Sequence, residues 1–285
     1  MAFQVPADAQ ALLLKLVLGL LAFVWVLWSI RGAHPRAVGM TITFPALNGV
    51  VLLTVTDKVV NEMVVGIIPL MLFNGFLPAL FMALRRKLGE RQWVVIALCL
   101  VIWAALAWML ESQPLWPHQR KAAAIAAIVV LACAAWAFAR LRASGLRAPS
   151  PASSVTLPRF LRDQAARIFW FMVSLAIVSW VAYTWPDAHS LVGRLSALPL
   201  VPLFVLHSAV SQRRADLSEL RISSLIGPVA AGAFLFLFTL SLGLIRTDAG
   251  DLHPAYWPIG LAMLLIEWEL TRRLILGLSA LTYRA

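Results

Sequence analysis

The residues best suited to chemistry in this chain are the few ionisable side chains that interrupt long apolar runs. Glu62 lies just inside the run 59–84, and Glu267 lies inside the run 256–272. An ionisable side chain inside hydrocarbon is costly, so each such residue is a candidate for proton or ion binding. The sequence therefore offers two acids as candidates for binding a coupling ion.

Glu62 has polar neighbours on the same predicted helix. Asn61 precedes it and Asn74 follows it, and two prolines interrupt the helix. Proline frees carbonyl groups, which is how membrane helices build polar cavities, so Glu62 is a candidate proton- or cation-binding carboxylate. The alternative is a helix N-terminal Glu that is stabilised by the helix dipole and by Lys58 four residues before it.

A very short turn is predicted before the same helix. Asp57 and Lys58 form the whole connection between the runs 38–56 and 59–84. So short a hairpin makes the two helices antiparallel neighbours, and Asn48 can then hydrogen-bond across to the second one. Asn48 is therefore either a packing residue or a ligand contact.

The two acids near the C-terminus differ in their local partners. Glu269 can pair with Arg272 or Arg273 on its own helix, which is an ordinary boundary ion pair. Glu267 has only the hydroxyl of Thr271 at position i+4. Glu267 is therefore the better candidate for a buried acid.

His207 ends the apolar run 191–210. Histidine titrates near neutral pH and suits proton relay, although a histidine at such a place can equally be an interfacial hydrogen-bonding residue. The other histidines are scattered over loops, and Cys99 and Cys133 lie inside apolar runs, so we expect no metal site and no disulfide. Motifs for ATP binding, serine hydrolysis and zinc proteolysis are missing from the sequence, so we assign no catalytic residue and no cofactor.

The amino-acid composition and the apolar runs predict membrane-spanning helices, and these helices must position the candidate residues. Of the 285 residues, 61% are hydrophobic and only 13% are charged. A soluble domain carries about 25% charged residues, so the lipid bilayer is the expected solvent. The predicted fold is an all-α, polytopic transmembrane bundle. Its nine expected spans are 11–30, 38–56, 59–84, 92–110, 122–139, 168–185, 191–210, 222–245 and 256–272.

Loop charges predict the orientation. With the N-terminus outside, about three quarters of the 24 Lys and Arg residues fall in cytoplasmic segments. This count places Arg36 in the first cytoplasmic loop and Arg194 on the outer side. We therefore expect a multi-pass protein of a bacterial inner (cytoplasmic) membrane, with a periplasmic N-terminus and a cytoplasmic C-terminus. The net charge of +11 follows from this pattern and does not require a nucleic-acid partner.

A weak internal repeat divides the chain. Gly39-x5-Pro45 recurs as Gly193-x5-Pro199, and an Asp-x11-Pro spacing recurs at the following span of each half. The predicted organisation is a first four-helix unit at 1–111, a connector helix with a Ser- and Pro-rich cytoplasmic linker at 112–167, and a second four-helix unit at 168–285. One connecting helix inverts the second unit, and inverted repeats are common in secondary transporters.

The second half also carries a family resemblance. The stretch ALPLVPLFVLHSAVSQRRADLSELRISSLIG resembles the small four-helix membrane proteins of the GlpM type. Those proteins have a Pro- and Phe-rich helix ending near a His, a short polar loop with LR, and a Gly-containing helix. The resemblance covers about 60 residues and implies gene duplication, without an activity that can be carried over.

These features support a secondary transporter or exporter of a small-molecule or lipid-linked substrate, coupled to protons or cations. One alternative is a non-catalytic subunit or scaffold for envelope polymer or lipid assembly, in a homo-oligomer or with an envelope-protein partner. The other is a membrane enzyme acting on a lipid head group, for which Asp216 and Glu219 beside Arg213 and Arg214 would be the acidic and basic groups.

We expect Glu62→Gln to abolish pH-driven flux in proteoliposomes without impairing folding, because the amide keeps the shape of the side chain but cannot bind a coupling proton. An entrapped pH-sensitive dye measures the flux, and size-exclusion chromatography checks the fold. Unchanged flux, or loss of expression instead of flux, would contradict a coupling role for Glu62.

Overall fold

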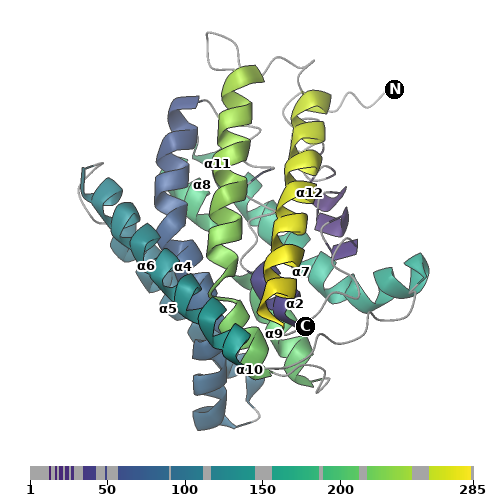
Figure 1. Cartoon of the computed structure of the whole chain (residues 1–285). Helices are drawn as coiled ribbons and strands as arrows, with labels where there is room; N and C mark the ends of the chain where they lie inside the picture. The colour runs from purple at the N-terminus through teal and green to yellow at the C-terminus, as the bar shows by residue number, and fades with distance from the viewer. Residues whose placement is uncertain are drawn as a thin grey trace.

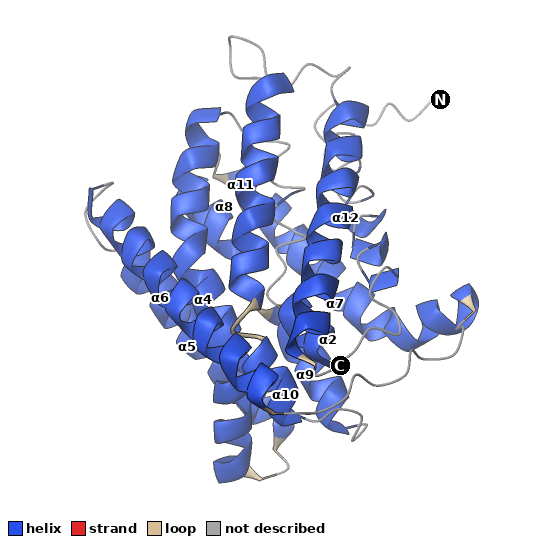
Figure 2. Cartoon of the chain, viewed as in Figure 1, coloured by secondary structure: helices blue, strands red, loops and turns tan. Residues whose placement is uncertain are grey.

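The structure, a computed structural model, is purely helical over the residues that it describes (Figure 2). These are residues 35–42, 57–89, 91–111, 117–144, 156–185, 189–211, 217–245 and 257–283, with Gly49 and scattered helical positions between 13 and 28. The expected all-α class is confirmed for this part of the chain.

Ten helices have described bounds. They are α2 (Pro35–Thr41), α4 (Asp57–Leu88), α5 (Gln92–Glu111), α6 (Pro117–Ala143), α7 (Leu157–Thr184), α8 (His189–Ser196), α9 (Leu200–Ser211), α10 (Leu217–Ser223), α11 (Gly227–Ile245) and α12 (Trp257–Thr282).

Five of these helices contain segments long and apolar enough to cross a membrane. The segments are Gly66–Leu88, Gln92–Leu110, Ala123–Ala143, Leu157–Val181 and Gly227–Leu244. They correspond to the third, fourth, fifth, sixth and eighth predicted spans. Large apolar side chains such as Trp108 and Trp136 are exposed on them, as lipid-facing positions require. The chain is therefore described as a multi-pass helical membrane protein.

The other predicted spans differ from the structure. The run 191–210 is divided into α8 and α9, and α12 continues ten residues past the predicted end at 272. Most of the first two predicted spans lies outside the described residues.

The linker predicted to reach residue 167 is also shorter than expected. α7 begins at Leu157 after the N-cap residue Thr156, with Pro158 in its first turn, so residues 157–167 are helical. Proline is favoured in the first turn of a helix, so the Pro that suggested a loop instead marks a helix start.

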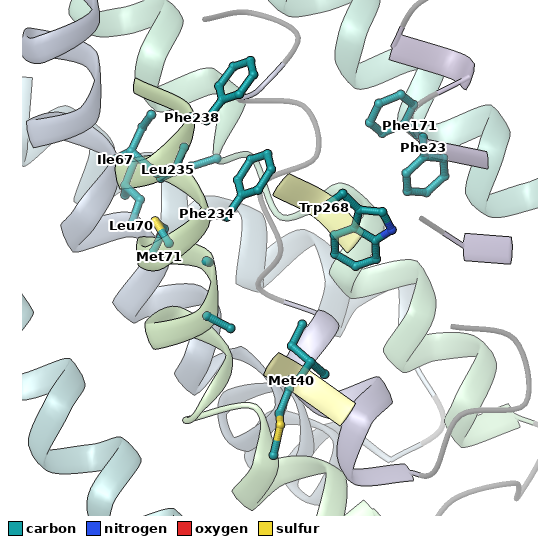
Figure 3. Close-up of a cluster of buried hydrophobic side chains, with 14 of the residues drawn as sticks. Phe23, Met40, Ile67, Leu70, Met71, Phe171, Phe234, Leu235, Phe238 and Trp268 are labelled. Atoms are coloured by element: carbon teal, nitrogen blue, oxygen red, sulfur yellow. The ribbon is translucent and has the colours of Figure 1, made fainter. Parts of the chain in front are cut away.

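α4 is the central helix of the bundle. It packs against α5, α6, α8, α9, α10 and α11, and α11 in turn packs against α12 (Figure 1). Its apolar side chains Ile67, Leu70 and Met71 lie near Phe234 and Phe238 of α11 in the main hydrophobic cluster (Figure 3). Segments that are far apart in the sequence therefore meet along α4.

Gly39 allows α2 to approach α10 closely. A Cβ atom at this position would lie 2.8 Å from the main-chain oxygen of Leu220 and would collide with the Ser223 side chain. The backbone oxygen cannot move without disturbing α10. The Gly39 position of the predicted repeat therefore has a packing role.

We expect Gly39→Ala to destabilise the fold by about 1–3 kcal/mol through overpacking of the α2–α10 contact. Thermal unfolding of the purified protein in detergent measures the loss. Gly277→Ala is the matched control, because a Cβ atom there would meet no atom of a neighbouring described helix within 4 Å and alanine favours a helix. Equal melting temperatures for the two variants would contradict the close approach.

Candidate functional site

The chain is interrupted between helices at two places, between α8 and α9 and between α10 and α11. Between α8 and α9 the chain leaves α-helical geometry, and Ala197 and Leu198 donate to carbonyls only three residues back. The main chain between α10 and α11 makes similar tight turns, in which Ile226 donates to Ser223. Pro199 and Pro228 have no N–H to donate, so each break lacks one hydrogen bond that a continuous α-helix would have there.

Both breaks contact adjacent residues of α4. The Asn74 Nδ2 atom donates to the Ala197 carbonyl at 3.1 Å, and the Ser224 hydroxyl donates to the Gly75 carbonyl at 2.8 Å. A Cβ atom on Gly75 would lie 3.0 Å from the Pro228 ring, so this glycine brings the second break against α4. One turn of α4 thus holds both interrupted helices.

Asn74 retains unused hydrogen-bonding capacity. Its side chain is 6% exposed, and its Oδ1 atom has no hydrogen-bond partner in the part of the chain that the structure describes. Pro78 also removes the helical N–H that would otherwise bond to the Asn74 carbonyl. Buried acceptors normally have partners, so this oxygen can bind a hydroxyl, an ammonium group or a cation.

Glu267 lies on α12 and faces α11. The carboxyl group is buried, and its Oε1 atom is hydrogen-bonded to the Ser241 hydroxyl. Its Oε2 atom is also buried, without a hydrogen-bond partner among the described residues. The expected buried acid is therefore found at a helix–helix contact.

Glu269, in contrast, accepts hydrogen bonds from Arg272 and Arg273 at 2.6 and 3.0 Å, as expected for a local ion pair. The side chains of these two arginines are 26% and 73% exposed. This local cluster is separate from the contact between Glu267 and Ser241.

A third polar cluster surrounds Arg36, where several helix ends meet. The guanidinium is fully buried and donates to both carboxylate oxygens of Glu219, at 3.2 and 3.1 Å. It also donates to the Thr282 carbonyl and to the Ser144 hydroxyl. The Tyr283 ring lies 3.8 Å from the guanidinium carbon, and its hydroxyl donates to Glu219. Arg36 therefore joins α2, α10, the end of α12 and the residue that follows α6.

Charge counting placed Arg36 in a cytoplasmic loop, but the structure shows a buried residue in a helix, and the side of the membrane stays a prediction. Arg36 lies in α2, and its partner Glu219 is 183 residues away in sequence. The sequence gives no local signal for such a pair. Glu219 was a candidate for lipid head-group chemistry, but both of its oxygens are occupied by Arg36 and Tyr283. Its proposed neighbours Asp216, Arg213 and Arg214 lie outside the described residues.

Arg194 is also buried, at 1% exposure, on α8. Its guanidinium lies near Gly66 of α4 and makes long contacts with the carbonyls of Ala107 and Leu110, at 3.5 and 3.4 Å. Cationic groups are stabilised at a helix C-terminus, which here is the end of α5. A signal for Arg194 was present in the sequence, because the residue lies within the predicted span 191–210.

The remaining predicted site residues are distributed as follows. His207 is half-buried on α9, and its ring centre lies 5.4 Å from that of Trp93. Glu62 and Asn61 lie in the first turns of α4, but their side chains are outside what the structure describes, as is Asn48. Within the described residues, no hydrogen bond joins Asn74, Glu267 and His207 into one cluster.

The chain has no match among family models, characterised proteins or solved structures. The resemblance to GlpM-type proteins therefore stays a prediction, and functional inference depends on the geometry.

We expect Arg36→Ala to destabilise the protein by roughly 3 kcal/mol or more, because it leaves the Glu219 carboxylate buried without its cation. Thermal unfolding in detergent measures the change. Arg273→Ala is the control, since its side chain is 73% exposed and a surface pair contributes about 1 kcal/mol or less. A small and equal effect of both substitutions would show that the Arg36 cluster does not hold the helix ends together.

Proposed function

We propose that this chain is a secondary transporter or exporter of a bacterial inner membrane, with a pathway that passes the two helix breaks beside Asn74 and Gly75. The observation that carries the proposal is the contact of both breaks with one turn of α4. Interrupted helices at membrane depth are tolerated where they are buried in protein or line a cavity, and transporters use them to bind substrates and coupling ions.

The position of the contact supports this proposal. Asn74 and Gly75 belong to the predicted first unit at 1–111, whereas Ala197 and Ser224 belong to the predicted second unit at 168–285. Transporters with repeated units bind substrates at the interface between the units. Nine spans, an inverted repeat, an outer N-terminus and a cytoplasmic C-terminus are parts of the same proposal.

The chemistry of the turn favours a substrate or ion that supplies hydrogen-bond donors or positive charge. The buried Asn74 Oδ1 atom can accept from such a group, and carbonyls released at the breaks can do the same. We assign the coupling role to Glu62, and an assisting role to Glu267 or His207. Asn61 and Asn48 are proposed to lie along the same pathway.

The scaffold hypothesis makes a different prediction for the breaks. In a scaffold they would be permanently packed protein, and no water would reach them from either side. The occupied carboxylate of Glu219 gives no support to a lipid head-group enzyme. Access of water to the breaks therefore discriminates between transport and scaffolding.

We expect Ser224→Cys to react with a membrane-impermeant thiol reagent from each face of the membrane in turn. The parent for this test is the chain with Cys99→Ala and Cys133→Ala, since these are its two cysteines. Alternating access exposes the breaks to water on both sides, and a thiol reacts as the hydrated thiolate. Labelling in oriented vesicles, followed by mass spectrometry, measures the reaction.

Phe76→Cys is the matched control, because Phe76 lies one residue beyond Gly75 on α4 and its side chain is 39% exposed at the apolar surface. Lipid at that surface should keep this cysteine unreactive. Reaction of the Ser224 variant from neither face, or from one face only, would overturn the proposal and favour a scaffold.

A further inference from the structure

The Glu267 carboxyl group, which contacts Ser241, is buried but has few hydrogen-bond partners among the described residues. In the described structure the carboxyl group has one hydrogen-bond partner, the Ser241 hydroxyl, at its Oε1 atom. Its Oε2 atom is buried and has no described hydrogen-bond partner. A permanent carboxylate normally accepts several hydrogen bonds or pairs with a cation, so this site is built for a group that is neutral for part of the time.

Ser241 can serve both states of such a group. Its oxygen lies 3.0 Å from the Leu237 carbonyl on its own helix and is also within hydrogen-bonding distance of Glu267 Oε1. A hydroxyl has one proton to donate and two lone pairs that accept. It can therefore donate to the Leu237 carbonyl while accepting from Glu267, or donate to Glu267 instead.

We propose that Glu267 and Ser241 form a proton-binding site between α11 and α12. In the protonated state the Glu267 O–H donates to Ser241 Oγ, and Ser241 donates to the Leu237 carbonyl. On release the O–H bond of Glu267 breaks, the proton passes to water, and both bonding electrons stay on the carboxylate. The Ser241 hydroxyl then rotates and donates to Glu267 Oε1.

Among the residues that the structure describes, the charged groups around this site do not compensate a carboxylate. The described helices with the most extensive packing against α12 are α11, α2 and α6. α11 has no titratable residue, and the one charge of α2, on Arg36, is paired with Glu219. The basic residues of α6 are found at its two ends (His118, Arg120, Lys121, Arg140 and Arg142), and its one other ionisable group is the uncharged thiol of Cys133. On α12 itself, Arg272 and Arg273 both donate to Glu269.

The proton-binding site and the break between α10 and α11 are joined by one helix, α11. Ser241 lies on α11, and the same uninterrupted helix begins at Gly227, directly after the break that contacts Gly75. Ionised Glu267 has a single donor in the packed arrangement, so proton release favours an arrangement in which Oε2 meets water. Such a change moves α11 relative to α12. This link to transport rests on the proposed function, whereas the proton site itself does not.

Infrared difference spectroscopy of the reconstituted full chain tests the proposal. We expect a carbonyl-stretch band of a protonated, dry carboxyl group that shifts in D2O, disappears as the pH is raised and is missing in Glu267→Gln. Ser241→Ala removes the donor to the carboxylate and should raise the titration midpoint of this band by about one pH unit or more.

Thr239→Val is the matched control, because the Thr239 hydroxyl donates to the Leu235 carbonyl at 2.7 Å on the same helix. We expect no shift of the midpoint in this variant. A band that persists in Glu267→Gln, or an equal midpoint in the Ser241 and Thr239 variants, would overturn the proposal. If Glu267→Gln does not fold, the Ser241 and Thr239 variants decide, since both keep the carboxyl group.

The outcomes of this test and of the labelling test are independent. A titrating Glu267 band with no labelling of the Ser224 variant would leave the proton site standing and remove the transport proposal. Labelling from both faces without a titrating band would remove the proton site and leave the transport proposal standing.

Discussion

The need to satisfy backbone hydrogen bonds in a non-aqueous environment is the constraint on which this structure depends. α4 contains two prolines, and the rods formed by α8–α9 and α10–α11 are both interrupted. Each interruption leaves polar groups that lipid cannot satisfy. Asn74 donates to the Ala197 carbonyl at the first break, and Ser224 of the second break donates to the Gly75 carbonyl, so both breaks lie against α4.

The buried polar clusters differ in how many of their polar atoms have hydrogen-bond partners. A fully bonded cluster stabilises the fold, whereas an incompletely bonded one is a candidate for binding a ligand or a proton. Around Arg36 the described contacts include both Glu219 oxygens, a hydroxyl, a carbonyl and an aromatic ring. So complete a network fixes one arrangement of the helix ends. Asn74 and Glu267 each keep an oxygen without a described hydrogen-bond partner. Incomplete bonding is costly in a static protein, and it is expected where a ligand or proton binds.

α11 connects the sites of Asn74 and Glu267, which are two of the incompletely bonded buried groups among the described residues. It starts at the break beside Gly75, and Ser241 lies near its other end. The stacked side chains of Phe234 and Phe238 and the neighbouring apolar residues of α4 fill the space between (Figure 3). Packed apolar contacts of this kind transmit small displacements, because close-packed interiors have low compressibility. A rigid helix with a polar site at each end is a suitable element for coupling a proton to a substrate.

The amino-acid sequence by itself determined that this chain is helical and that it resides in a membrane. Five of the predicted spans have counterparts in the structure, because hydropathy and length are local properties of the chain. The burial of Glu267 was also expected from the lack of a charged partner at i+4. Only the tertiary structure decided that Arg36 is buried against Glu219, that Arg194 meets the carbonyls at the end of α5, and that Asn74 faces the interruption within 191–210. These features depend on partners that are 123 to 183 residues apart or on distant carbonyl groups, and composition and spacing carry no information about such contacts.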